Sequence, residues 1–394
     1  MHGAHHDRSH SLDSPAGHYG SRRDFFGTLI GAGWGAMSLL EGSIARAGLA
    51  RAQSAGSATN LFDVEQVADG VYAALARPAA MINSNAAIFV NSEDVLVMDT
   101  HSKPSAAAAL IAQIRKEVTP KPVRYVVNSH FHWDHMQGNA AYRATFPKVD
   151  FVSSVATRTL MALEAPSRLK KSLADLPGEV EKTRAALGRA ASEREKAFYR
   201  RMLDEQEAYR KEMALFRLEL PTLTLDHGIV LHDQAHTLEL AFWGRAHTAG
   251  DVVIFCPEKK VVATGDMIHG FLPFIADGYP REWPKTIDVV ARYAFAAIIP
   301  GHGPVHRDRV RIRHMREYIE ELSAKVADGK KAGRSVAELQ KTITRASLRS
   351  LQTDNYETLV RDALRKFTMV PGEPNLEEGI MSNVKDVFDT LDKK

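Results

Sequence analysis

The sequence is nearly without cysteine: Cys256 is the only one in 394 residues. No intramolecular disulfide can therefore form, and no cysteine pair can hold a structural zinc. Cys256 lies in an apolar run, which predicts core packing.

Surplus charge is also scarce, since 51 Lys and Arg against 48 Asp and Glu leave a net charge of +3. We therefore expect no nucleic-acid partner. Any bound metal must be held by histidine and carboxylate.

No apolar run is long enough to span a bilayer. The run considered for this role lies near the N-terminus. It covers residues 25–40, is rich in glycine, and is shorter than the roughly 20 residues that span a bilayer. Arg22 and Arg23 precede it, and the sequence Ala-Arg-Ala follows at residues 45–47. This pattern resembles a twin-arginine export signal over residues 1–47. A second Ala-Arg-Ala at 50–52 leaves cleavage after Ala47 or Ala52 open.

This resemblance predicts a periplasmic protein that is exported by the twin-arginine translocation machinery. The alternative is a short membrane anchor or an amphipathic helix, for which the run is too short and too rich in glycine. In the mature chain we expect no membrane-spanning segment.

Strand-like and helical segments alternate along the rest of the chain. Apolar strands are expected at 71–75, 86–90, 95–99, 123–127, 223–225, 229–231, 238–242, 252–255, 260–264 and 298–299. Helices are expected at 105–117, 286–297, 315–327, 336–348 and 356–367. Two strand-rich parts flank a charged helical segment, so we expect an α/β sandwich of two sheets with helices outside.

The charged segment runs from about residue 173 to 220. Its apolar residues recur with steps of three, four and seven, which places them on one face of a helix. Either a helical hairpin packs on its own domain here, or the segment forms a lid or an arm that joins two copies in a homodimer. The sequence leaves both open.

The strongest motif is an H-x-H-x-D-H cluster that follows the strand at 123–127. It contains His130, His132, Asp134 and His135. The spacing lets the first two histidines hold one ion while the aspartate and the last histidine turn toward a second. Imidazole and carboxylate without thiolate favour zinc, with iron and manganese as alternatives.

Further candidate ligands follow in three more polar loops. His247 lies in a glycine-bounded loop, Asp266 comes just after an apolar strand, and His302 sits in the turn Pro-Gly-His-Gly-Pro. Each signal is weak alone. Together, four strand-end loops that carry such residues predict a single metal centre.

These residues, with Asp99 at the end of an earlier strand, resemble the metallo-β-lactamase superfamily over residues 61–306. The resemblance implies an αββα four-layer sandwich, with the helical segment as an insertion and residues 307–394 as a helical C-terminal extension. It implies two metals, the first held by His130, His132 and His247 and the second by Asp134, His135 and His302. Asp266 would bridge the two ions, and Asp99 would support the histidine loop.

Two close dications lower the pKa of a shared water and polarise a carbonyl or phosphoryl oxygen, so the resemblance implies a zinc hydrolase of small molecules. Asp134 could also act catalytically by moving a proton. An acidic Asp266 resembles the pattern of ester, lactone and thioester hydrolases, which we place first. A β-lactamase, a mononuclear iron enzyme of the sulfur-dioxygenase kind and a non-catalytic metal-binding protein are the alternatives.

Residues soon after Asp266 are candidates for the substrate mouth. They are His269, Phe271 and Phe274. Ordinary loop packing is the alternative for each of them. The remaining histidines of the mature chain lack motif support, and we expect none of them to bind metal: His101, His227, His232, His236, His306 and His314.

Overall fold

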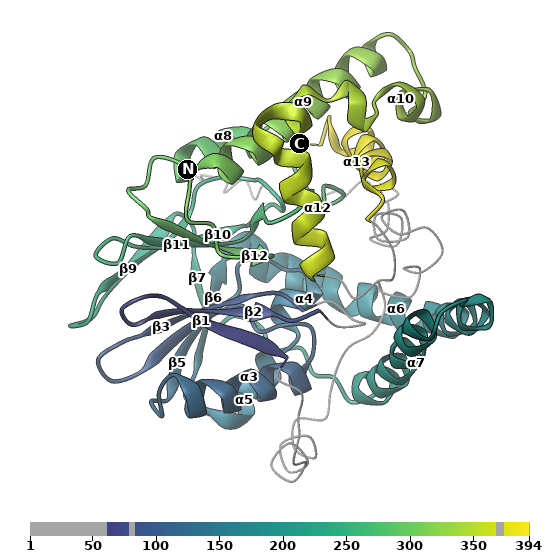
Figure 1. The fold of residues 1–394 in the computed structure, drawn as a ribbon. Coiled ribbons are helices and arrows are strands. Elements are labelled where there is room, and N and C mark those ends of the chain that lie inside the picture. The colour runs from purple at the N-terminus through teal and green to yellow at the C-terminus, as the bar shows by residue number, and fades with distance from the viewer. Residues whose placement is uncertain (1–60, 79–82, 368–373, 394) are drawn as a thin grey trace, which may run out of the picture.

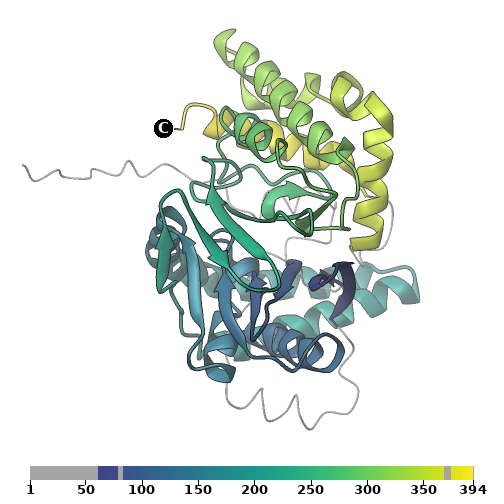
Figure 2. The ribbon, with the colours of Figure 1, turned by 90° about the vertical axis from the view of Figure 1, so that its left-hand side faces the viewer.

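The computed structural model describes residues 61–78, 83–367 and 374–393. Two β-sheets lie face to face, and helices cover the outer face of each (Figures 1 and 2). The predicted four-layer αββα sandwich is therefore confirmed. The proposed export signal and its cleavage sites lie outside the described residues.

The first sheet has seven strands that follow one another in chain order. They are β1 (Phe62–Ala68), β2 (Val71–Ala76), β3 (Ala86–Val90), β4 (Val95–Met98), β5 (Val123–Val127), β6 (Asp150–Ser154) and β7 (Leu223–Leu225). The strands from β1 to β4 pair antiparallel, and those from β4 to β7 pair parallel. The carboxyl ends of β4 and β5 therefore meet at one edge of the sheet.

The second sheet has five strands, in the order β12, β11, β10, β9 and β8. Their bounds are β8 (Gly228–His232), β9 (Thr237–Phe242), β10 (Val252–Cys256), β11 (Val261–His269) and β12 (Ala297–His302). β11 and β12 run parallel, and His269 pairs with His302 at their ends. Side chains at the ends of these two strands are consequently neighbours.

Three apolar clusters hold the four layers together. One lies between the two sheets and contains Cys256, which is fully buried as predicted. A second packs the first sheet against α3 (Pro104–Glu117) and α5 (Asn139–Thr145). The third packs the second sheet against α8 (Trp283–Val290) and the C-terminal helices.

A long helical hairpin leaves the first sheet between β6 and β7. It consists of α6 (Val155–Arg189) and α7 (Glu193–Met213) and extends to one side of the sandwich (Figure 1). The predicted apolar face is present, since Phe198, Met202 and Tyr209 are buried.

The start of this helical segment differs from the expectation of about residue 173. The helix begins at Val155 and continues through Pro166 and Pro177, although proline interrupts the hydrogen bonding of a helix. Packing of α6 against α7 and the body compensates for the backbone hydrogen bonds that proline cannot donate.

After β12 the chain is helical, as expected, but the helix expected at 336–348 ends at Thr342. The elements are α9 (Val310–Lys331), α10 (Val336–Thr342), α11 (Arg349–Gln352), α12 (Tyr356–Phe367) and α13 (Leu376–Thr390), with two short 3₁₀ turns at Arg345–Ser347 and Thr353–Asn355. α12 reaches down from this layer toward the rest of the sandwich (Figure 1).

The helix expected at 286–297 is shorter than predicted, because α8 ends at Val290 and β12 begins at Ala297. Within the described ranges, none of the helices combines the length and apolar character that crossing a membrane requires.

Candidate metal centre

The histidine cluster lies at the carboxyl end of β5 and continues into α4 (Trp133–Met136). Asp99, just past β4, secures this loop with both of its carboxylate oxygens. Oδ1 accepts from the Ser129 backbone N–H at 2.7 Å, and Oδ2 accepts from the Ser129 hydroxyl at 2.7 Å. Oδ2 also lies 2.7 Å from Nδ1 of His135. The Nε2 atom of His135 is thereby left to face the site.

The second sheet brings the other predicted residues to the same edge. His247 lies in the loop between β9 and β10, and its Nδ1 is 3.0 Å from the backbone oxygen of Phe274. Asp266 lies on β11 and His302 ends β12. Asn85, just before β3, donates to the carbonyls of Pro300 and Gly303 at 2.9 and 2.8 Å, which fixes the turn around His302.

Two glycines allow the close approach of these strands. A Cβ atom on Gly301 would stand 2.0 Å from Oδ1 of Asp266, and one on Gly265 would stand 2.4 Å from the Ser129 hydroxyl. Gly265 also has φ of +52°, which glycine adopts without strain. A side chain on Gly265 would push the two halves of the site apart, and one on Gly301 would displace Asp266.

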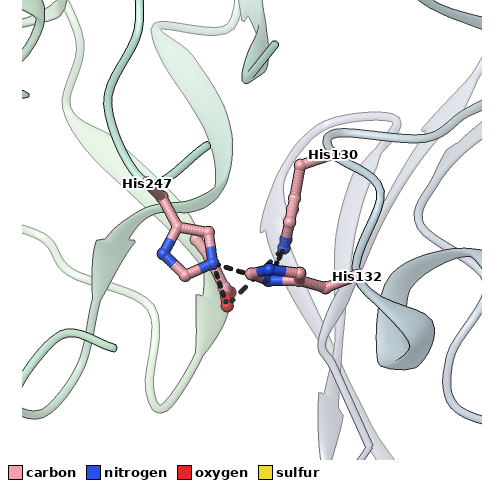
Figure 3. A group of neighbouring side chains, drawn as sticks. His130, His132 and His247 are labelled. Carbon is pink, nitrogen blue, oxygen red and sulfur yellow. Dashed lines mark hydrogen bonds and ion pairs between the residues drawn. The ribbon is translucent and has the colours of Figure 1, made fainter. Parts of the chain in front are cut away.

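The structure brings all seven predicted ligands together in two groups. His130, His132, His247 and Asp266 form the first, and Asp134, His135 and His302 form the second. In each group, one donor atom from every residue lies within 4.8 Å of the others. Figure 3 shows the histidines of the first group converging from the two halves of the sandwich.

Within the first group, Nδ1 of His132 lies 2.9 Å from Nε2 of His130 and 2.9 Å from Nε2 of His247. In the second group, Nε2 of His302 lies 3.1 Å from Oδ2 of Asp134. Each group therefore presents several donor atoms to one point.

Asp266 faces both groups, with one oxygen toward each. Its Oδ2 lies 3.4 Å from Nε2 of His247. Its Oδ1 lies 3.3 Å from Nε2 of His135 and 3.4 Å from Nε2 of His302. A carboxylate in this position can bridge two ions.

The electrostatics of the buried cluster favour added positive charge. Burial opposes ionisation of His302, yet Asp266 and Asp134 raise its pKa to about 9. Burial is likewise overcome at His135, whose pKa the nearby carboxylates raise well above its usual value. Burial and then the adjacent histidines lower the pKa of His130 well below its usual value, so this ring is a neutral donor.

Asp266 stays ionised despite its burial, because His302 and other histidines hold its pKa well below the usual range. Its Oδ1 atom is buried and accepts no hydrogen bond. This set of imidazoles and ionised carboxylates, with one unsatisfied oxygen, fits divalent metal ions. The ions would supply the positive charge that protonated His135 and His302 supply without them.

The three residues predicted for the substrate mouth lie beside the two groups. Phe274 has its ring centroid 5.8 Å from that of His132, and Phe271 has its centroid 5.9 Å from that of His302. His269 is buried, with Nε2 3.6 Å from Oδ2 of Asp266. Burial lowers the pKa of His269 to about 3, despite an opposing effect of Asp266, which keeps the ring neutral.

Three residues near the site were not foreseen. Asp277 contacts the ring of His132, Arg168 of α6 contacts Asp277, and Phe367 at the end of α12 lies 5.5 Å from His302 between ring centroids. The histidines expected not to bind metal belong to neither group: His101, His227, His232, His236, His306 and His314.

Comparisons with known proteins agree with this geometry. The family model described as the metallo-beta-lactamase superfamily matches residues 81–302. A curated relative, the metallo-beta-lactamase type 2 of Bacillus cereus, is 31% identical over 74 residues. That match covers 17% of this chain and only 29% of the relative's length.

Solved structures similar to this chain include two metallo-beta-lactamases. The one from Pontibacter korlensis is 19% identical, with a TM-score of 0.48, over 66% of this chain and 99% of the other. The DIM-1 metallo-beta-lactamase is 16% identical, with a TM-score of 0.45, over 66% of this chain and 97% of the other.

The family model covers more than half of the chain, and both ligand groups lie inside the matched segment. The chain therefore belongs to the metallo-beta-lactamase superfamily.

Proposed function

We propose that this chain is an exported dinuclear zinc hydrolase that cleaves an ester, lactone or thioester. The position of Asp266, with one oxygen toward each ligand group, is the observation that carries this proposal. The bound ions would supply an activated water and a polarised carbonyl oxygen. Residues of both sheets would hold the ions and the substrate in a buried site.

Each residue has a defined part in this proposal. The first ion would be held by His130, His132 and His247, and the second by Asp134, His135 and His302, with Asp266 shared. Asp99 would keep the histidine loop in place through its bonds to Ser129 and His135. Oδ2 of Asp134 would take and return a proton as the substrate breaks down.

Zinc is proposed because every candidate donor is an imidazole or a carboxylate, which also leaves iron and manganese as alternatives. Aromatic rings stand beside both groups, with Phe274 next to His132, and Phe271 and Phe367 next to His302. These rings support a substrate with an apolar group near the bond that is cleaved.

A β-lactamase is the second candidate, because the curated relative carries that name. The acidic residue at position 266 is the reason to place it second. A sulfur-dioxygenase-like enzyme with one iron is the third candidate. We place it last because Asp266, which faces both ligand groups, would then have no second ion to bind.

A panel of substrates tests the proposal. The purified mature chain would be assayed with an aryl ester, a homoserine lactone, a glutathione thioester, nitrocefin and a phosphodiester. We expect one of the first three to have a kcat/KM at least about tenfold above that of nitrocefin. Removal of metal with a chelator should abolish this turnover and zinc should restore it. If nitrocefin is the best substrate, the β-lactamase reading replaces ours.

The proposed localisation is the periplasm, and it rests on the pattern around Arg22 and Arg23. Replacing both by lysine should trap unprocessed protein in the cytoplasm, since the signal requires the paired arginines. Fractionation and mass measurement would show this, with Arg8→Lys as a control that leaves the pair intact. Processed, periplasmic Lys-Lys protein would contradict export by this route.

The proposed partners are the twin-arginine translocation machinery and a second copy of this chain that contacts the hairpin of α6 and α7. Leu163 on α6 has 71% of its surface exposed and offers an apolar contact for such a copy.

A further inference from the structure

The ring of His132 uses its two nitrogens for different purposes. Nδ1 points at the other histidines of the first group, 2.9 Å from Nε2 of both His130 and His247. Nε2 points the opposite way and lies 2.8 Å from Oδ2 of Asp277. A carboxylate that accepts a hydrogen bond from Nε2–H keeps the proton on Nε2 and leaves the lone pair on Nδ1. Asp277 therefore sets both the tautomer and the direction of this ring.

Asp277 is itself held by a residue of the helical hairpin. Two guanidinium nitrogens of Arg168 each lie 2.8 Å from one oxygen of Asp277, in a two-pronged contact. Arg168 is held in turn by Glu164, one helical turn earlier on α6, at 2.8 and 2.9 Å. Its guanidinium also lies 4.8 Å from the ring centroid of Phe131. The planar guanidinium of an arginine can contact both oxygens of a fixed carboxylate at once, which the flexible ammonium group of a lysine does less well.

The C-terminal end of the chain fixes the backbone of the same loop. Nζ of Lys393 donates to the backbone oxygen of Asp277 at 2.9 Å and lies 4.4 Å from the ring centroid of Tyr279. Asp277 is thus fixed from both sides, and only 6% of its surface is exposed. These contacts hold the carboxylate of Asp277 against the ring of His132.

Apolar packing holds α6 against the site independently of the arginine. Phe131 and Met136 of the histidine loop form a buried cluster with Met161 and Ala165 of α6. Loss of the Arg168 charge would therefore leave the helix docked, which makes the role of the arginine testable.

We infer that Arg168 and Asp277 are positioning residues for the first metal, and that the helical insertion is in this way part of the metal centre. The inference rests on the metal centre of the proposed function. It implies that docking of α6 and binding of the first metal favour each other, since such coupling is reciprocal. Neither residue is expected to touch the substrate.

Zinc affinity of the full mature chain tests this role without any substrate. We expect Arg168→Met to weaken one of the two zinc sites about ten- to a hundredfold, the range for losing the support behind a ligating histidine. Arg168→Lys should recover part of the loss, because a lysine can still contact one oxygen of Asp277. Arg184→Met is the matched control, since Arg184 is on the same helix but is exposed and pairs with Glu181.

Three further experiments separate positioning from general damage. The visible spectrum of the cobalt-substituted chain should change in Arg168→Met and stay unchanged in the control. Hydrogen exchange over residues 155–189 should slow on zinc binding in the wild type and respond less in Arg168→Met. Combining Arg168→Met with Asp277→Asn should weaken zinc binding little more than the worse single change, because both act through His132.

Wild-type zinc affinity and an unchanged cobalt spectrum in Arg168→Met would overturn the inference. A wild-type chain that binds two zinc ions but cleaves no ester, lactone or thioester would overturn the proposed function instead, and would leave this inference standing. A wild-type chain without zinc affinity would overturn both.

Discussion

Asp266→Asn should lower the rate of hydrolysis at least about a hundredfold. It should also abolish or markedly weaken the binding of one metal ion. Asparagine keeps the shape of the side chain but removes the charge that offsets repulsion between two dications. Because the two oxygens of Asp266 face His247 and His135 at 3.4 and 3.3 Å, the change affects both groups at once. Metal analysis and kcat/KM on the best substrate would measure the effect.

Asp386→Asn is the matched control for this experiment. Asp386 is equally buried but lies on α13 and belongs to neither ligand group. We expect two metals and wild-type turnover in this control. If Asp266→Asn also retained both, Asp266 would not be a bridge and the β-lactamase alternative would move to first place.

Asp266→Ser gives a second view of the same position. It should not produce strong turnover of β-lactams, because the aromatic residues around the two groups are unchanged by it. Strong nitrocefin turnover in this variant would show that position 266 alone selects the substrate class.

His130→Ala and His302→Ala should each reduce hydrolysis to the background rate. Each change removes an imidazole from a different group, so each variant should lose mainly one ion and keep part of the other. Elemental analysis after equilibration with zinc, together with turnover at saturating zinc, would check both effects.

His236→Ala provides the histidine control. His236 is buried like the candidate ligands, but its Nε2 contacts the side chain of Asn91 at 3.0 Å and it belongs to neither group. Its replacement should leave metal content unchanged. Wild-type turnover in either ligand variant would contradict the assignment of that residue.

Much of the candidate site could be predicted because its residues lie in short motifs at strand ends. His130 and His135 follow a compact apolar strand, and His302 lies in a turn marked by glycine and proline. Parallel pairing of β4 with β5, and of β11 with β12, then brings these ends to one edge. Local sequence patterns and sheet topology therefore agree at this place.

The supporting residues could not be predicted, because their role depends on packing between distant segments. Asp277 lies 145 positions from His132, and Arg168 lies 109 positions from Asp277. No local spacing links them, and an arginine on a charged helix is ordinarily solvated. Only the docking of α6 beside the histidine loop gives Arg168 its partner.

Some elements were also hidden by weak local signals. The short strand β6 ends in two serines and was not predicted, and α6 begins at Val155, well before the expected start at about residue 173. In both cases tertiary packing outweighs the local preference.

Metal content of the purified wild-type chain tests the central claim most directly. Elemental analysis of the chain, as isolated and after equilibration with zinc, would count the ions per chain. We predict about two zinc ions per chain in the wild type, and fewer in the His130→Ala and His302→Ala variants. A single tightly bound iron per chain, with zinc unable to support hydrolysis, would contradict the dinuclear hydrolase and favour the oxygenase reading.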